Sequence, residues 1–510
     1  MDSHGEHKSL WSATVEGVTF EPLRSDTEVD VAIVGAGITG LTAALRLKRA
    51  GKRVAVLERG HVASGSTGST SAHLTTMFDV GYHTIEKTYD RDTVSAVARS
   101  MYEAIDEIEK LVHELNIDCG FARLNGYYYT EDDSGIEQVE KEFESCRRGG
   151  LPVTMLDQVP LPYPTSKGFS VERQARFHPI AYCNGLARAV HGDGCAVYTG
   201  TPVLELSDGE PGTIRTSEAT VKARDIILAT HTPLGINPLQ TALSVERSYV
   251  IAVRMPAGVP DGLFWNTATP YEYTRPYHMP DGTPLLVVGG KDHAVGLGDP
   301  LQSLQSLVQF TRDRFSYDEV LYNWSTQYYG PADSLPFIGK SPFHSHLYVS
   351  TGYSGDGLTM GTLGGMIVGD AVLERGNQYA RVYKPRRLNI GGISEFIQLG
   401  VHNAEMLIGG HLTQGKKPES LSPGESTVHR HHGALTAIHR DEDGKLHSRN
   451  AVCPHMKCVV HWNDGERTWD CPCHGSRYTI DGNIIEGPAL SGLKEEQKTE
   501  RPTEAPTHAP

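Results

Sequence analysis

The sequence predicts an α/β protein with more than one domain. The first observation is a continuous apolar run at residues 29–34, which is typical of a parallel strand buried on both faces. A glycine-rich turn, a helical segment ending near Ala50 and a second strand at 53–57 follow it and complete a βαβ unit. The second observation is length, because 510 residues exceed one ordinary hydrophobic core and indicate two or three domains. The third is a pair of short loops, at 453–458 and 471–476, that each contain Cys and His.

The βαβ unit carries a dinucleotide-binding fingerprint. Gly35, Gly37 and Gly40 form the pattern Gly-x-Gly-x-x-Gly between the first strand and the helix. Glycine allows the tight turn and the close approach of a pyrophosphate, whose charge is stabilised by the helix N-terminus. Glu58 ends the second strand, where an acidic side chain binds ribose hydroxyls. The fingerprint by itself does not separate NAD from FAD.

The two Cys/His loops offer the ligands of a metal centre. Cys453 and His455 form the pattern Cys-x-His, and Cys471 and His474 form Cys-x-x-His. Zinc accepts two Cys and two His, but its structural sites usually space them as C-x₂₋₄-C and H-x₃₋₅-H, unlike either loop. The loops resemble the Rieske motif, in which two thiolates hold one iron of a [2Fe–2S] cluster and two imidazoles hold the other. By this resemblance Cys453 and Cys471 hold one iron and His455 and His474 the other; structural zinc or an inactive site is the alternative.

The Rieske resemblance also implies roles for the neighbouring residues. Cys458 and Cys473 match the positions that form a disulfide between the loops in the Rieske proteins of quinol-oxidising membrane complexes. Ser476 and Tyr478 match hydroxyls that hydrogen-bond the cluster and a cysteine sulfur in high-potential members. Such bonds stabilise the reduced cluster, so we expect a potential in the upper part of the range of roughly −150 to +300 mV. The resemblance further implies a small all-β domain.

Several other segments resemble the flavoprotein family that includes D-amino-acid oxidase, glycine oxidase and sarcosine oxidase. Residues 65–68 lie where this family surrounds the pyrophosphate, 201–205 resemble its adenine-contacting strand, and 347–359 resemble its C-terminal flavin motif. The strand at 225–230 resembles one that ends beside the pyrophosphate. The resemblance implies FAD, a Rossmann-type FAD-binding domain and an α+β substrate domain with an antiparallel sheet. The FAD-binding residues that it implies are Gly35, Gly37, Ile38, Thr39, Gly40, Glu58, Arg59, Ser66, Thr67, Val203, Ala229, Gly355, Gly357, Leu358 and Thr359.

The candidate substrate residue is Arg275. Residues 120–175 and 240–330 contain alternating segments that fit the antiparallel substrate sheet of this family. Within them, 271–276 and 281–282 resemble the family's Tyr-x-Arg-Pro…Asp-Gly segment. In amino-acid oxidases an arginine of this sheet can pair with the substrate carboxylate, because guanidinium binds carboxylate bidentately. Arg275 is therefore the catalytic-site candidate, and a surface charge is the alternative.

These assignments divide the chain into five parts. Residues 1–27 are expected to form an arm on the body, and 28–375 the FAD-dependent oxidoreductase. Its FAD-binding parts are 28–80, 180–235 and 331–375, with the substrate sheet in the segments between. Residues 376–420 are a linker with a helix at 393–408, 421–493 form the Rieske domain, and 494–510 a disordered tail.

Composition argues against several kinds of partner. The net charge is −15 and no basic stripe stands out, so nucleic-acid binding is not expected. No stretch of 18 or more apolar residues and no secretory signal is present, so no transmembrane anchor is expected. Four of the eight cysteines lie in the Rieske motif, and the others are expected to be free thiols of a cytoplasmic protein.

The two cofactors together predict an oxidoreductase. We expect a dehydrogenase in which a small amine or amino acid gives a hydride to the flavin. The electrons would then leave singly through the cluster to an external quinone, cytochrome or ferredoxin. An oxidase would need no cluster, because reduced flavin reacts with oxygen directly. Two alternatives stay open: a redox sensor or electron-transfer adaptor, and a flavin/Rieske reductase supplying an oxygenase, which would need a second dinucleotide site.

Overall fold

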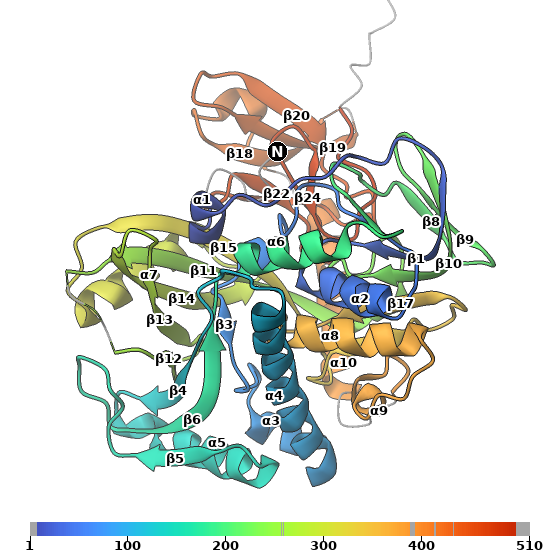
Figure 1. Cartoon of the computed structure of the whole chain (residues 1–510). Helices are drawn as coiled ribbons and strands as arrows, with labels where there is room; N and C mark the ends of the chain where they lie inside the picture. Colours follow the sequence, from blue (N-terminus) through green and yellow to red (C-terminus); the bar gives the residue numbers. More distant parts are fainter. Residues whose placement is uncertain are drawn as a thin grey trace, which may run out of the picture.

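The computed structural model describes residues 8–495, apart from 257, 259, 388–392, 413–414 and 432. It consists of two large sheets with helices and a smaller C-terminal β module (Figure 1). The predicted tail at 494–510 lies outside the described residues beyond Glu495.

The first sheet grows from the predicted βαβ unit, which is β1 (Thr27–Val34), α2 (Ile38–Arg49) and β2 (Val54–Leu57). Its strand order is β16-β17-β10-β1-β2-β7, and the strands from β17 to β7 run parallel. The other strands of this sheet are β7 (Ala196–Tyr198), β8 (Glu205–Ser207), β9 (Gly212–Arg215), β10 (Thr220–Leu228), β16 (Phe337–Lys340) and β17 (Leu347–Thr351). Helices α6 (Pro179–Val190) and α8 (Gly357–Val372) pack against α2. Because the carboxyl ends of parallel strands meet at one edge, the turn after β1, Glu58 and Ala229 converge there.

The second sheet has the order β15-β11-β14-β13-β12-β4-β6-β3 and is antiparallel except between β12 and β4. Its strands are β3 (His73–Leu74), β4 (Ala122–Thr130), β5 (Val153–Leu156), β6 (Lys167–Arg176), β11 (Leu243–Arg254), β12 (Leu263–Asn266), β13 (Glu272–His278), β14 (Pro284–Ala294) and β15 (Val320–Pro331). Side chains alternate between the faces of a strand. Strands β11 and β15 therefore present different residues to the two sides of this sheet.

Helices complete the body of the molecule. Helix α4 (Arg91–Glu114) buries an apolar stripe, and its N-cap Asp90 accepts a hydrogen bond from Thr93 N at 2.8 Å. The expected N-terminal arm contains a short helix, α1 (Leu10–Thr14), where Trp11 is fully buried and donates to Thr70 O at 2.6 Å. The remaining α-helices of this part are α3 (Tyr82–Glu86), α5 (Ile136–Gly149), α7 (Pro300–Arg314) and α9 (Ala380–Tyr383).

The C-terminal module is all-β, as predicted. A three-stranded sheet contains β18 (Ser426–His431), β19 (Ala434–Arg440) and β20 (Leu446–Asn450). A four-stranded sheet contains β21 (His461–Asn463), β22 (Thr468–Asp470), β23 (Arg477–Tyr478) and β24 (Ile484–Glu486). The predicted linker helix is α10 and extends further than expected, over Ile393–Leu412.

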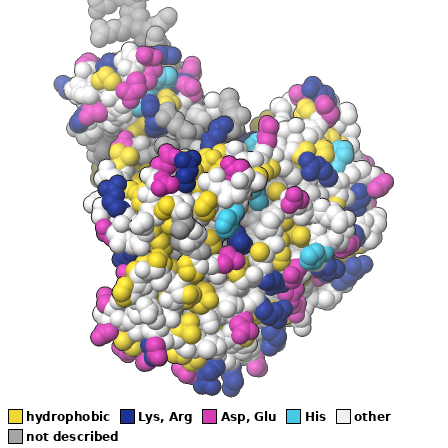
Figure 2. All heavy atoms as spheres, turned by 60° about the vertical axis from the view of Figure 1, so that its left-hand side comes forward, with side chains coloured by type: hydrophobic (Ala, Val, Ile, Leu, Met, Phe, Trp, Pro, Cys, Tyr) yellow, Lys and Arg dark blue, Asp and Glu magenta, His cyan; other side chains and the backbone are white. Residues whose placement is uncertain are grey.

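The surface carries charges of both signs. On the face drawn in Figure 2, acidic and basic side chains are interspersed over most of the area. Within the described part of the chain, no helix combines the length and the apolar character needed to cross a bilayer.

Candidate functional site

A cavity of about 970 Å³ follows the carboxyl edge of the parallel sheet. Its volume is at the upper end of the roughly 300–1,000 Å³ typical of ligand pockets. The predicted FAD-binding residues line it, except Gly40 within α2 and Thr359 in the first turn of α8. Val203 lines it from the loop before β8, rather than from a strand as expected. Residues of the second sheet and of the C-terminal module line the remaining walls, so three parts of the chain contribute to one cavity.

The turn after β1 has the geometry of a pyrophosphate site. Gly35 has φ +107°, and a Cβ placed on it would lie 2.4 Å from Ala229 O, so only glycine fits. No side chain caps α2 at Gly37, and Ile38 N donates to Thr67 Oγ1 at 3.3 Å. The helix N-terminus borders the cavity, where it can stabilise an anion. The Glu58 carboxylate accepts hydrogen bonds of 2.9 Å from Ala36 N and from Gly60 N, which hold it at the cavity wall. These groups fit a dinucleotide with its pyrophosphate at the turn and a ribose at Glu58.

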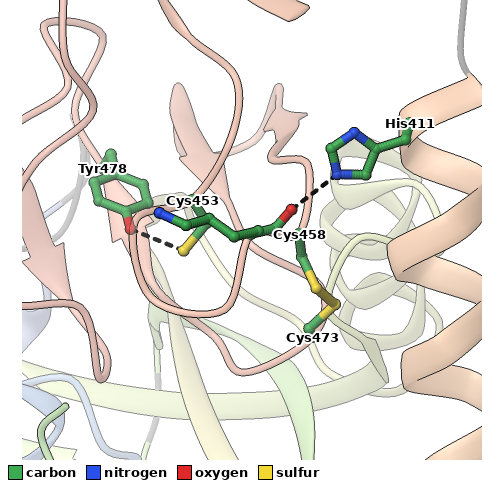
Figure 3. Close-up of a disulfide and its surroundings, with 6 residues drawn as sticks. His411, Cys453, Cys458, Cys473 and Tyr478 are labelled. Atoms are coloured by element: carbon green, nitrogen blue, oxygen red, sulfur yellow. Dashed lines mark hydrogen bonds between the residues drawn. A yellow bond between two sulfur atoms is a disulfide. The ribbon is translucent and has the colours of Figure 1, made fainter. Parts of the chain in front are cut away.

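The two Cys/His loops meet in the C-terminal module. Cys453 and Cys471 are buried, and the Tyr478 hydroxyl lies 3.1 Å from Cys453 Sγ (Figure 3). A disulfide joins Cys458 to Cys473 and links the loops beside this pair (Figure 3). The imidazole rings of His455 and His474 lie 5.0 Å apart between centroids and are nearly perpendicular. The structure thus brings all six residues predicted from the motif together.

The hydrogen bonds of His455 determine its tautomer. Its Nε2 lies 3.0 Å from Gly235 O and 3.1 Å from Gln240 Oε1. The Gln240 amide nitrogen donates to Pro233 O and Gly235 O, so its Oε1 is an acceptor. Because both neighbours accept, Nε2 of the neutral ring carries the hydrogen and Nδ1 has a free lone pair.

The Nδ1 atoms of His455 and His474 lack partners. Both are buried and have no hydrogen-bond partner among the described residues. Burial lowers the pKa of both imidazoles, to about 4 for His474, where the nearby His455 adds to the effect. A buried nitrogen without a partner is costly, whereas a neutral imidazole is a good metal ligand. The two rings therefore fit ligation through Nδ1.

The two thiols complete the donor set. A hydrogen bond from the Cys471 thiol lowers the pKa of Cys453 to about 6, with a smaller contribution from Tyr478. Thiolate is the form of cysteine that binds metals. In the described ranges no group of three or more His, Cys, Asp or Glu side chains is placed to hold one metal ion. A Rieske cluster takes two protein ligands per iron, and two pairs are what these loops provide.

The loop of His474 rests on strand β15 of the second sheet. Gln327 Nε2 donates to Gly475 O at 2.9 Å, and the Tyr329 hydroxyl donates to His474 O at 3.2 Å. Gly475 has φ +71°, and a Cβ on it would lie 2.6 Å from Gln327 Nε2. Glycine at this position therefore allows the loop to contact the strand directly.

A buried ion pair fixes the same interface. Arg247 of β11 and Asp470 of β22 are 1% and 4% exposed in their side chains, and Nη2 lies 3.0 Å from Oδ2. Arg477 also contacts Asp470, with Nε 3.3 Å from Oδ1. Although burial raises it, these two guanidinium groups hold the pKa of Asp470 below its usual range. Asp470 is thus an anion next to the predicted ligand Cys471, held by one cation from each part of the molecule.

Comparison with known proteins identifies both parts. Residues 30–371 match the family model "FAD dependent oxidoreductase" (DAO), and residues 413–497 match the model "Rieske [2Fe-2S] domain". The chain belongs to the FAD dependent oxidoreductase family. FAD and a [2Fe–2S] cluster are its cofactors, in agreement with the geometry of the cavity and the loops.

Individual relatives share this organisation in whole or in part. The chain is 31% identical over 498 residues to the Rieske 2Fe-2S iron-sulfur protein YhfW of Bacillus subtilis (strain 168), covering 96% of this chain and 97% of the relative. It is 24% identical to gamma-glutamylputrescine oxidoreductase of Escherichia coli (strain K12), over 72% of this chain and 89% of that protein. The fold of glycine oxidase from Geobacillus kaustophilus superposes with a TM-score of 0.59 at 18% identity, covering 71% of this chain and 99% of the other.

The structure of this FAD dependent oxidoreductase does not bring Arg275 to the cavity. Arg275 is fully buried outside the cavity lining and donates to Ala72 O. Its guanidinium carbon lies 5.2 Å from the centre of the Trp11 ring and 5.8 Å from that of Tyr277. The expected carboxylate-binding role is therefore not supported. The N-terminal helix α1 covers Arg275, a contact between distant segments that the local motif at 271–276 does not reveal.

Sequence reasoning missed several residues of this site. His231, Tyr328 and Tyr329 line the cavity of the oxidoreductase, as do Asp79 and Asp292. Asp79 precedes α3 and Asp292 lies on β14, and neither belongs to a recognisable motif. The C-terminal residues that reach the cavity were also missed; they are Thr479, Asn483, Ile484, Ile485, Glu486, Gly487, Ala489 and Leu490. Packing between distant segments brings these groups together, and no spacing in the sequence predicts it.

Proposed function

We propose that the protein is an FAD-dependent dehydrogenase that oxidises a small amine or amino acid and transfers the electrons within one molecule to its own Rieske cluster. Bound FAD supplies hydride acceptance, and the cluster supplies one-electron transfer. The observation that carries the proposal is the shared cavity: Ile485 and Glu486 of the Rieske domain wall the same space as Gly35 and Glu58.

Strand β15 connects the two centres. Gln327, Tyr328 and Tyr329 all line the cavity, and Gln327 and Tyr329 also hold the backbone of the His474 loop. The Tyr329 ring meets His231 edge-on at 4.7 Å between centroids, and His231 Nδ1 lies 2.8 Å from Ser66 Oγ. A short chain of contacts thus joins the predicted pyrophosphate loop to the cluster loop. This proximity supports electron transfer inside the molecule.

The oxidised substrate is proposed to be a small amine or amino acid. A relative acts on gamma-glutamylputrescine by its name, and the structural neighbour is a glycine oxidase. The cavity is concave and lined by several polar side chains, which favours an enzyme over a redox adaptor. A reductase would need a second dinucleotide site, and the sequence has one fingerprint.

The external acceptor is proposed to be a quinone, a cytochrome or a ferredoxin. Because His455 Nε2 is bound to the oxidoreductase part, the acceptor would approach the other side of the cluster loop. Met456 and Lys457 lie there between His455 and Cys458, and both are exposed.

An anaerobic panel of amines and amino acids tests the proposal. The holoprotein is mixed with each compound, and flavin absorbance and cluster EPR are recorded on the same samples. The proposal predicts that at least one compound bleaches the flavin and that the signal of the reduced cluster follows. Bleaching of the flavin with an EPR-silent cluster would overturn the internal transfer, and no bleaching by any compound would overturn the amine-oxidising function.

A further inference from the structure

Acidic and phenolic side chains gather where the second sheet walls the cavity. Asp79 and Asp292 line it together with Tyr271, Tyr273 and Tyr328. Glu246 on β11 is close enough to raise the pKa of Asp292. Such a set of groups attracts a cation and repels an anion.

Asp79 is fixed beside the predicted flavin motif. Its Oδ1 accepts a hydrogen bond from the Tyr271 hydroxyl, and its Oδ2 accepts one from Gly355 N at 2.9 Å. Gly355 belongs to the loop that precedes α8 and that the family resemblance places at the flavin. A group bound by Asp79 would therefore lie next to the predicted flavin loop.

Asp292 has an unused oxygen in the same cavity. Its Oδ2 accepts a hydrogen bond from the Tyr328 hydroxyl at 2.9 Å, whereas the buried Oδ1 has no partner among the described residues. Burial, together with the negative charges of Asp79 and Glu246, raises the pKa of Asp292 to about 7, although the hydroxyls of Ser248 and Tyr328 act in the opposite direction. A buried carboxylate oxygen without a donor lacks a stabilising partner.

The cations of the cavity wall do not supply that partner. In the described lining they are Arg59 and Lys141. Lys141 Nζ lies 2.5 Å from Glu137 Oε1, and Arg59 donates to Ile485 O in the electrostatic field of Glu58 and Glu486. Lys291, next to Asp292 in sequence, is paired with Glu272 at 2.5 Å. The wall near Asp79 and Asp292 thus has an excess of acidic over basic side chains.

Aromatic rings complete this part of the wall. The rings of Tyr271 and Tyr273 lie 6.0 Å apart between centroids, and Trp265 lines the same cavity. Aromatic faces attract ammonium groups, an effect of about 0.5–2 kcal/mol per contact in other proteins.

We propose that Asp79 and Asp292 bind the ammonium group of the substrate, which is a cationic amine rather than an amino acid held by its carboxylate. This inference rests on the proposed function, because it assumes that the bound amine is the compound that the protein oxidises. The α-carboxylate of an amino acid would meet two acidic groups here, and Arg275, the expected partner of such a carboxylate, lies outside the cavity lining. Asp292 provides the free acceptor oxygen. Asp79 places the bound ammonium group next to the flavin loop.

A pair of matched probes tests the proposal without turnover. tert-Butylammonium chloride and sodium pivalate share a tert-butyl group and carry opposite charges. Neither has a hydrogen on the carbon that carries the charged group, so neither can be oxidised there. Each is titrated into the oxidised holoprotein by calorimetry and by flavin absorbance. We expect saturable binding of tert-butylammonium with a change in the flavin spectrum, and binding of pivalate at least tenfold weaker.

Three variants locate the binding. Asp292→Asn keeps the acceptor for Tyr328 and removes the charge, and we expect it to weaken tert-butylammonium binding at least tenfold. Asp79→Asn is the second variant and is expected to act in the same direction. Asp157→Asn makes the same change at a fully exposed position outside the cavity lining, and binding is expected to stay within twofold of wild type.

The outcomes separate this inference from the proposed function. Preferred binding of pivalate, or unchanged tert-butylammonium binding in both Asp292→Asn and Asp79→Asn, would overturn the ammonium subsite. If an amino acid were still oxidised in that case, the dehydrogenase function would stand alone. Conversely, charge-dependent binding of tert-butylammonium without oxidation of any amine would leave the subsite in place and remove the dehydrogenase.

Discussion

Tyr478 controls the environment of one predicted cluster sulfur. Its hydroxyl lies 3.1 Å from Cys453 Sγ, and a hydrogen bond to a ligand sulfur stabilises the more negative, reduced cluster. We predict that Tyr478→Phe lowers the reduction potential. A hydrogen bond is worth about 1 kcal/mol net, which corresponds to a decrease of about 40 mV for one electron. EPR-monitored redox titration measures it.

A tyrosine outside the cluster provides the control. The Tyr102 hydroxyl donates to Glu172 O, so Tyr102→Phe is expected to leave the potential unchanged. An unchanged or higher potential in Tyr478→Phe would show that this hydroxyl does not tune the cluster.

Binding of a cationic amine is expected to depend on the protonation of Asp292. Burial raises the pKa of this carboxyl to about 7, and that of Glu246 to about 7 as well. Below pH 7 these groups bind protons and lose their charge, while tert-butylammonium stays charged. We predict that its affinity falls about tenfold per pH unit below 7 and is constant above it. Calorimetry between pH 5.5 and pH 8.5 measures this, and a pH-independent affinity would contradict it; Asp292→Asn is expected to show a weaker and flatter profile.

Individual residues differ in how far the sequence reveals them. Each short loop of the predicted cluster site contains its Cys and its His within four residues, so a local pattern is enough to predict His455 and His474. The partners of His455 come from Gly235 and Gln240, more than 200 positions away, and no local pattern contains them. Arg275 shows the opposite case, because a plausible local motif is overruled by packing against Trp11.

Strands β11 and β15 act as the element that joins the two cofactor sites. We predict that Arg247→Leu destabilises the Rieske domain by about 3 kcal/mol, because it leaves the Asp470 carboxylate in a buried site with one cation fewer. Urea unfolding followed by the visible absorbance of the cluster measures it. Arg254→Leu on the same strand is the matched control, since its partner Glu319 is exposed and the expected loss is below about 1 kcal/mol. Equal losses in the two variants would rule out a special role of the buried pair.

The contact between the His474 loop and β15 requires glycine. We predict that Gly475→Ala costs about 2 kcal/mol, because alanine disfavours φ +71° and its Cβ would overlap Gln327. Slower flavin-to-cluster electron transfer is expected with it, because the loop must move off the strand. Gly376→Ala, where a Cβ meets nothing within 4 Å, is the control. If Gly475→Ala behaved like this control in thermal unfolding and in transfer rate, the direct contact would be refuted.

The sequence predicts the individual domains of the molecule, but it does not predict how they pack against each other. The βαβ unit, the long helix α4 and the all-β C-terminal module follow from periodicity and motifs, because each buries its own apolar face. The placement of the Rieske domain on the second sheet depends on scattered polar contacts, among them Arg247–Asp470 and Tyr329–His474. These contacts decide that the loop of His474 lies against the second sheet of the oxidoreductase, a point that the sequence leaves open.

We propose that electrons pass from the flavin to the cluster within one molecule. The most direct test reduces the flavin of the anaerobic holoprotein with a light flash and follows flavin absorbance and the cluster signal over a range of protein concentrations. An internal path predicts first-order reduction of the cluster with a rate constant independent of protein concentration and a lower one in Arg247→Leu. A rate that rises in proportion to protein concentration, or a cluster that stays oxidised while the flavin is reduced, would contradict it.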